Sequence, residues 1–194
     1  ARGPFTVQDG RLALAEADAF ETDPVNILRL FREAARLDAR IHPEAMRAVT
    51  RNLESIDAGM RADPEARRLF VEMLTDRQHG EWLLRLMNET DVLGRFLPEF
   101  GRIVSMMQFN MYHHHTVDEH TIQTIGVLNR IMRGELPEDH PLATEIVAGR
   151  SPHDRVLHVA LLLHDIGKGT RRDHSEYGAE IAREVCPRLG LDEA

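Results

Sequence analysis

An apolar segment that ends in two ionisable residues constrains this chain more than any other feature. Residues 161–163 are all leucine and lead directly into His164 and Asp165. Such a run belongs in a protein core, where a carboxylate is costly unless it is paired or binds a metal ion. The chain has 24 lysine and arginine residues, and its single lysine, Lys168, stands three positions after Asp165. We therefore expect Asp165 to have a specific partner.

Composition narrows the classes of protein that fit. A chain of 194 residues is long enough for one domain with a sizeable core. Its net charge of −8 disfavours broad electrostatic attraction to nucleic acid or to an anionic membrane. The single cysteine excludes an intramolecular disulfide and fits a reducing compartment. Without a membrane-length apolar run or a signal-peptide pattern, the expected location is the cytoplasm.

The pattern of apolar residues predicts a mostly α-helical chain with a small β-hairpin at its start. Residues 5–14 alternate around Asp9-Gly10, a pair that favours a tight turn. Helical spacing then follows Asp23-Pro24, Pro43 and Asp63-Pro64, and shorter helices are expected over 80–88, 90–96 and 98–106. We divide the chain into a hairpin lead-in (1–22), a helical support region (23–110) and a C-terminal core (111–194).

Capping patterns mark the helices of the C-terminal core. Residues 116–119 read Thr-Val-Asp-Glu, a capping box, and predict a helix from Val117 to about Arg133 with Gly134 as its stop. Residues 151–154 and 173–176 predict two further helix starts. The middle helix is apolar on almost every side, so we expect it to be central and buried. The histidines at 113–115 are interpreted as a connector.

Four side chains that can bind a metal ion point toward apolar faces of three predicted helices. They are His120, His164, Asp165 and His174, placed on helical wheels at about 100° per residue. Imidazoles with a carboxylate suit a divalent first-row metal or magnesium. Each residue also has an ordinary structural interpretation: a hydrogen-bonded core histidine, a carboxylate paired with Arg171, or a histidine at a helix start. Lys168 could simply be a cation near a helix C-terminus. The combination favours a metal site.

The spacing of these residues resembles the HD superfamily of metal-dependent phosphohydrolases. Three longer strings narrow the resemblance: 112–120 (YHHHTVDEH), 163–169 (LHDIGKG) and 173–179 (DHSEYGA). They resemble the HD domain of the bacterial bifunctional uridylyltransferase/uridylyl-removing enzymes, which modify the nitrogen-signalling protein PII. Residues 23–31 (DPVNILRLF) resemble the segment that leads into that domain.

The resemblance implies an HD-type helical domain and a role for each candidate residue. His120, His164 and Asp165 would bind a divalent metal, Mg²⁺ or Mn²⁺ in preference to Fe or Zn. His174 would be a further ligand, for a second ion. Lys168 would contact the scissile phosphate, so that Lys168 and Asp165 form the catalytic pair. The implied reaction releases UMP from PII.

Two departures from the family pattern predict that this chain is a fragment. The further aspartate that usually completes an HD site is absent before Ala194, and so is the nucleotidyltransferase signature. The resemblance places glutamine sensing in domains outside this chain. Three alternatives remain at the level of sequence: an HD phosphohydrolase acting on a free nucleotide, a non-catalytic helical module that binds a partner, and a purely structural core ion pair at Asp165.

Overall fold

A small three-stranded sheet opens the chain in the computed structural model, which describes residues 3–107, 116–147 and 154–191. Strands β1 (Phe5–Gln8) and β2 (Arg11–Leu14) are antiparallel, with Phe5 opposite Leu14. Asp9 and Gly10 between them have φ of 50° and 72°, as a two-residue hairpin turn requires. The predicted hairpin is thus confirmed. The sequence did not predict β3 (Arg40–Ile41), a two-residue strand that pairs parallel to β2.

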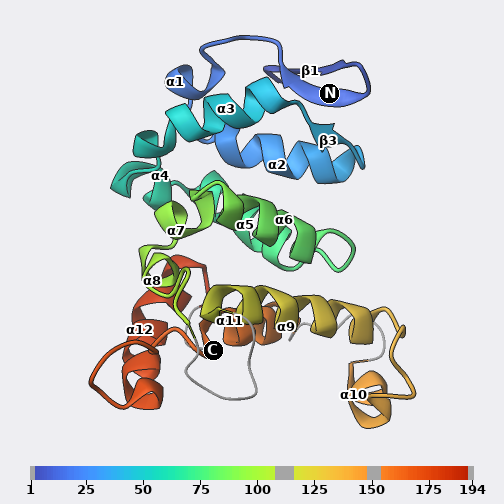
Figure 1. The fold of residues 1–194 in the computed structure, drawn as a ribbon, viewed down its shortest axis with the longest axis vertical. Coiled ribbons are helices and arrows are strands. Elements are labelled where there is room, and N and C mark those ends of the chain that lie inside the picture. The colour runs from blue at the N-terminus through green and yellow to red at the C-terminus, as the bar shows by residue number, and fades with distance from the viewer. Residues whose placement is uncertain (1–2, 108–115, 148–153, 192–194) are drawn as a thin grey trace.

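Helices account for most of the remaining chain, as predicted (Figure 1). Proline and a capping side chain start several of them; the carboxylate of Asp63, for example, accepts hydrogen bonds from the N–H groups of Glu65 and Ala66. The first group of helices comprises α1 (Ala19–Thr22), α2 (Asn26–Arg36), α3 (Pro43–Arg51), the 3₁₀ turn η1 (Leu53–Ser55) and α4 (Ala58–Ala62). The second comprises α5 (Pro64–Leu74), α6 (Gly80–Glu89), α7 (Val92–Phe96) and α8 (Pro98–Gly101).

The C-terminal part contains the helices that matter for the candidate site: α9 (Val117–Met132), α10 (Pro141–Ile146), α11 (Asp154–Leu163) and α12 (His174–Arg188). Gly134 has φ of 72° and follows α9 as predicted. The short α10 was not predicted. The histidines at 113–115 and the start expected at 151–153 lie outside the described residues.

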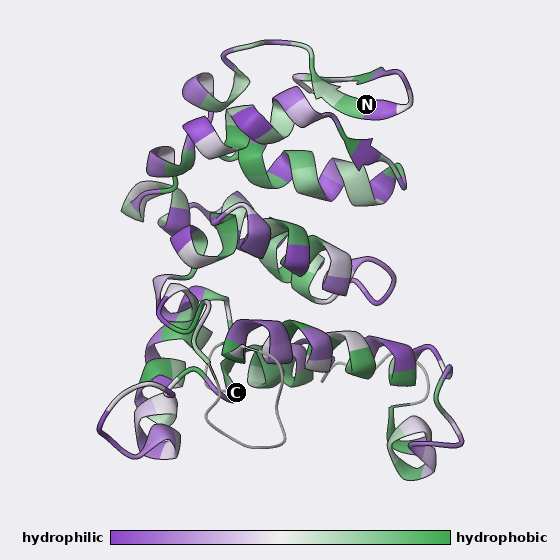
Figure 2. Ribbon diagram, viewed as in Figure 1, coloured by the Kyte–Doolittle hydropathy of each residue, from purple (hydrophilic) through white to green (hydrophobic). Residues whose placement is uncertain are grey.

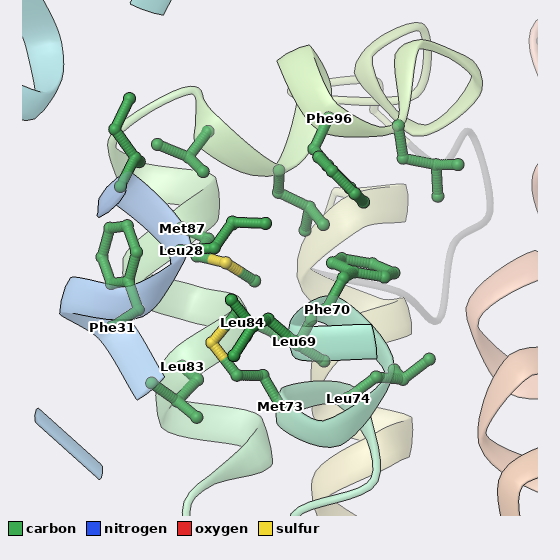
Figure 3. Packing of buried hydrophobic residues seen from close by; sticks show 14 of the residues in the cluster. Leu28, Phe31, Leu69, Phe70, Met73, Leu74, Leu83, Leu84, Met87 and Phe96 are labelled. Carbon is green, nitrogen blue, oxygen red and sulfur yellow. The ribbon is translucent and has the colours of Figure 1, made fainter. Parts of the chain in front are cut away.

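A continuous hydrophobic core joins the successive layers of helices (Figures 1 and 2). In its centre, α5 and α6 pack against each other and α2 packs on α5. Figure 3 shows this region, where the rings of Phe70 and Phe96 lie 5.0 Å apart. The same core extends to α9, α11 and α12, so the C-terminal helices are fixed against a rigid support. No helix among the described residues is both long and apolar enough to cross a membrane.

Helix α11 differs from the prediction of burial on every side. Val159, Leu162 and Leu163 are buried, but Val156 and Leu157 are 49% and 39% exposed. The helix packs on α9, α12 and α5, and these contacts leave Val156 and Leu157 partly exposed. The sequence could not indicate this because the apolar residues continue around the helix.

Candidate metal centre

Two packed helices bring three of the predicted ligands together. His120 is the fourth residue of α9, and His164 and Asp165 directly follow the last residue of α11. Each of the three offers a ligand atom, and these atoms all lie within 4.8 Å of one another. The grouping joins residues 44 or 45 positions apart in sequence (164 − 120 and 165 − 120). The family resemblance implied a common site for these three residues together with His174.

The donor atoms of the group suit a metal ion. His164 Nδ1 lies 2.6 Å from the carbonyl oxygen of Leu161 and can donate its proton there. The lone pair of Nε2 is then available to bind a metal ion. That Nε2 is 3.3 Å from Asp165 Oδ2. The rings of His120 and His164 have centroids 5.5 Å apart. Two imidazoles and one buried carboxylate thus bring their ligand atoms close together, and this set of donors suits a divalent cation.

A tight turn after α11 fixes the carboxylate and the lysine. The N–H of Ile166 donates to the Leu163 carbonyl oxygen, and the N–H of Lys168 donates to that of Asp165. Ile166 is buried and anchors the turn in the core. Lys168 Nζ then lies 2.7 Å from Asp165 Oδ2. Asp165 is 8% exposed, and this ammonium compensates the charge of the buried carboxylate.

His174 is placed apart from the three grouped residues. It is the first residue of α12, is exposed, and lines with His164 a groove of about 390 Å³. Its predicted role as a further metal ligand stays a prediction. Asp173 caps this helix by accepting hydrogen bonds from the N–H groups of Ser175 and Glu176, as its sequence pattern indicated.

Close approach of α12 to the site depends on Gly167. A Cβ at Gly167 would lie 2.2 Å from the carbonyl oxygen of His174 and 2.8 Å from the backbone nitrogen of Gly178. On α12, Gly178 lies opposite Gly167. A Cβ there would meet Gly167 at 3.8 Å, which is ordinary contact. The missing side chain that matters therefore belongs to the turn and not to the helix.

The capping box predicted before α9 is wrong. Thr116 is the N-cap but makes no side-chain capping hydrogen bond. Glu119 instead pairs with Arg85 of α6. Asp118 is buried and accepts hydrogen bonds from the side chain of Asn88 and the N–H of Ser105. Tertiary contacts thus replace the local cap that the pattern suggested.

A buried histidine that the sequence analysis did not single out links α9 and α11. His158 Nδ1 lies 2.6 Å from the Asp154 carbonyl oxygen, and Nε2 lies 2.8 Å from Asn129 Oδ1. Burial lowers the pKa of this ring below its ordinary value. Asp154 also pairs with Arg77, which precedes α6. These contacts fix the two helices that carry the grouped ligands.

Comparison with known proteins shows that two segments of the chain match family models. Residues 5–96 match the family model of the uridylyltransferase GlnD third domain, and residues 117–194 match the HD domain model. A solved structure entitled "Structure of tRNA-processing enzyme complex 3" shares the fold, with a TM-score of 0.53 and 20% identity over 91% of this chain and 40% of that one.

Curated relatives resemble the chain along nearly its whole length. The bifunctional uridylyltransferase/uridylyl-removing enzyme of Novosphingobium aromaticivorans is 54% identical over 99% of this chain, and that of Ruegeria pomeroyi is 56% identical over 98%. The chain spans 21% of the length of each. The chain therefore belongs to the bifunctional uridylyltransferase/uridylyl-removing enzyme family and contains an HD domain of that family.

Proposed function

We propose that this chain carries the uridylyl-removing activity of its family, the metal-dependent hydrolysis that releases UMP from uridylylated PII. The observation that carries the proposal is the group of His120, His164 and Asp165, whose ligand atoms lie within 4.8 Å of one another. The HD domain match and the names of the curated relatives support it. PII as substrate and UMP as product are part of the proposal.

The residues of the site divide the work between binding and charge compensation. His120, His164 and Asp165 would hold a divalent ion, with Mg²⁺ or Mn²⁺ preferred over Fe or Zn. Such an ion acidifies water and polarises a phosphoryl oxygen. Lys168, whose Nζ lies beside the carboxylate, would offset negative charge that develops on the phosphate oxygens. Because UMP is joined to a tyrosine in the proposed substrate, the phenolate leaves readily and needs little help from a general acid.

Access to the group also suits a protein substrate. His164 is exposed, whereas Asp165 beside it is buried. A phosphodiester on an exposed tyrosine could therefore reach the ligands from outside without opening the core. The buried carboxylate would keep its position while the substrate approaches from the histidine side.

The proposal is tested by incubating the chain with uridylylated PII and Mn²⁺ and measuring released UMP by chromatography. His120→Ala and Asp165→Ala should abolish release. His140→Ala removes an exposed histidine at the N-terminus of α10 and should leave release unchanged. Hydrolysis of free nucleotides without release from PII would instead support a nucleotide phosphohydrolase. A metal-free chain that binds PII but releases nothing would support a non-catalytic module.

A further inference from the structure

Asp118 is a buried carboxylate close to the metal centre that the proposed reaction does not use. It lies in the first turn of α9, two positions before His120, and is 4% exposed. Residues two apart on a helix point about 200° away from each other, so Asp118 faces away from the metal side. Asp118 is accordingly not one of the three grouped ligands, which are His120, His164 and Asp165. A carboxylate buried there needs a reason, because its desolvation is unfavourable.

Both oxygens of Asp118 bind segments that are distant in sequence. Asn88 Nδ2, near the end of α6, donates to Oδ2 at 2.8 Å. The backbone N–H of Ser105 donates to Oδ1 at 3.1 Å. Ser105 has φ of 58°, a left-handed conformation that a residue other than glycine seldom adopts without support. The carboxylate thus joins α9 to α6 and supports an unusual turn.

The turn at Ser105 also contacts the residue that follows Lys168. The next residue, Met106, accepts a backbone hydrogen bond from Val117 at the start of α9. Its side chain also covers Gly169, where a Cβ would lie 2.2 Å from the Met106 methyl carbon. Gly169 directly follows Lys168. Asp118 is therefore connected to His120 through its helix and to Lys168 through the turn.

We propose that Asp118 is a positioning residue, which sets the first turns of α9 and the Ser105 turn so that His120 and Lys168 are held in place around Asp165. This inference rests on the proposed metal-dependent function and adds a residue that does not touch metal or substrate. Ligands that two different helices carry keep a constant distance from each other only if both helices are held in place. His158 fixes α9 to α11 at one level, and Asp118 fixes the end of α9 that carries His120.

Titration of the metal-free chain with Mn²⁺ by calorimetry tests the proposal. Asp118→Ala should weaken Mn²⁺ binding about tenfold, the lower end of the effect of removing an outer support from a metal ligand. Asp118→Asn is the conservative rescue and should bind within about threefold of the unaltered chain. It keeps an oxygen for the Ser105 N–H. Its new amide can donate to Asn88 Oδ1, which is buried and has no partner among the described residues, once the Asn88 amide rotates.

Two further variants separate an effect on the position of the ligands from an effect of charge and from a loss of folding. Glu119→Gln removes a negative charge from the same helical turn, but this residue pairs with Arg85 on the half-exposed side, so Mn²⁺ affinity should be unchanged. Asn88→Ala removes one of the two hydrogen bonds and should give an intermediate loss. It also keeps the test decisive if Asp118→Ala fails to fold. Circular dichroism melting in a chelator checks that each variant is folded.

The outcomes distinguish this inference from the proposed function. If the unaltered chain binds no Mn²⁺, the proposed function fails and the inference with it. If the unaltered chain binds Mn²⁺ and folded Asp118→Ala binds equally well, only the inference is overturned. Binding by Asp118→Asn as weak as that of Asp118→Ala would indicate an effect of charge and would also overturn it. An equal loss in Glu119→Gln would do the same.

Discussion

Lys168 Nζ lies 2.7 Å from Oδ2 of Asp165, the same carboxylate oxygen that lies 3.3 Å from Nε2 of His164. The chain's single lysine thus contacts the one carboxylate of the grouped ligands. A cation held by the histidines would share that carboxylate with the ammonium. Because the ammonium and a metal ion beside the same carboxylate would repel each other, Lys168 should weaken metal binding slightly while it favours an incoming phosphate. The two effects can be measured separately.

Replacement of Lys168 should reduce turnover without emptying the metal site. We expect Lys168→Met to lower the rate of UMP release by about 10²-fold, as for loss of one group that stabilises transition-state charge. Mn²⁺ affinity should stay equal or increase, because a neighbouring positive charge is gone. UMP release and calorimetric titration give the two values. Lys168→Arg keeps the charge but changes its shape, so partial activity is expected. Unchanged turnover in Lys168→Met would reject the phosphate role.

Replacement of Asp165 should abolish metal binding and leave the fold intact. Asp165→Ala removes the only carboxylate of the group, and Lys168 loses its ion partner. The ammonium is partly exposed and can turn to solvent, so the free energy of unfolding should fall by only about 1–2 kcal/mol, less than for a fully buried pair. Elemental analysis and urea unfolding check both points. Asp139→Asn, at an exposed position, is the control. A gain in stability would show that the desolvation of the carboxylate costs more than its contact with Lys168 contributes.

His174 offers a test of metal number. If it binds a second ion, as the family resemblance implies, His174→Ala should lower the metal content from two ions per chain to one while the first ion stays bound. Mass spectrometry of the intact metal-loaded chain measures the content. The residue is exposed at the start of α12, so the substitution should change stability little. Identical metal content in both proteins would remove His174 from the ligand set.

Two glycines should respond in opposite ways to a methyl group. Gly167→Ala places a Cβ 2.2 Å from a backbone oxygen, which cannot yield as a side chain could, so the loss of stability should be about 1–3 kcal/mol. Gly178→Ala has room and lies within α12, where alanine favours the helix by about 1 kcal/mol. Thermal melting of the two variants in a chelator compares them. Equal effects would contradict the close approach at Gly167.

The parts of the fold that local chemistry determines were predictable from sequence. Asp9-Gly10 specifies its hairpin because both residues tolerate positive φ, and Asp63 marks its helix because an acceptor there satisfies free N–H groups. The grouping of His120 with His164 was predictable only through the resemblance to HD proteins. Helical wheels place each histidine on an apolar face, but they do not say which faces meet.

Contacts between distant segments were not predictable. Thr116 and Glu119 satisfy the capping-box pattern, yet Glu119 finds Arg85, 34 positions earlier, and Asp118 finds Asn88. The capping-box pattern describes hydrogen bonds that these residues can make within one helical turn. The packing of α6 against α9 determines which contacts they make in the folded chain. Gly167 gave no signal for the same reason, since a glycine in a turn is expected whether or not a helix crosses over it.

Acid should weaken the link between α9 and α11 through His158. Burial holds the pKa of this ring below the value of 6.5 that it has when unfolded, despite the neighbouring Asp154 carbonyl, which favours the protonated form. Below pH 6.5 the ring therefore binds a proton more readily in the unfolded chain than in the folded chain. The stability that the neutral ring contributes is complete above pH 6.5 and declines as pH falls toward the folded-state pKa.

His158→Gln isolates this contribution because glutamine keeps polar atoms but does not titrate in this range. At pH 8 the variant should be less stable by about 1–2 kcal/mol, the cost of impairing the buried contacts of the ring with Asn129 and Asp154, to one of which the neutral ring donates its N–H. The difference between the two proteins should narrow between pH 7 and pH 5, since only the unaltered chain loses this term. Urea unfolding at several pH values measures the gap. A gap that stays constant or widens in acid would mean that the ring is already charged in the folded protein.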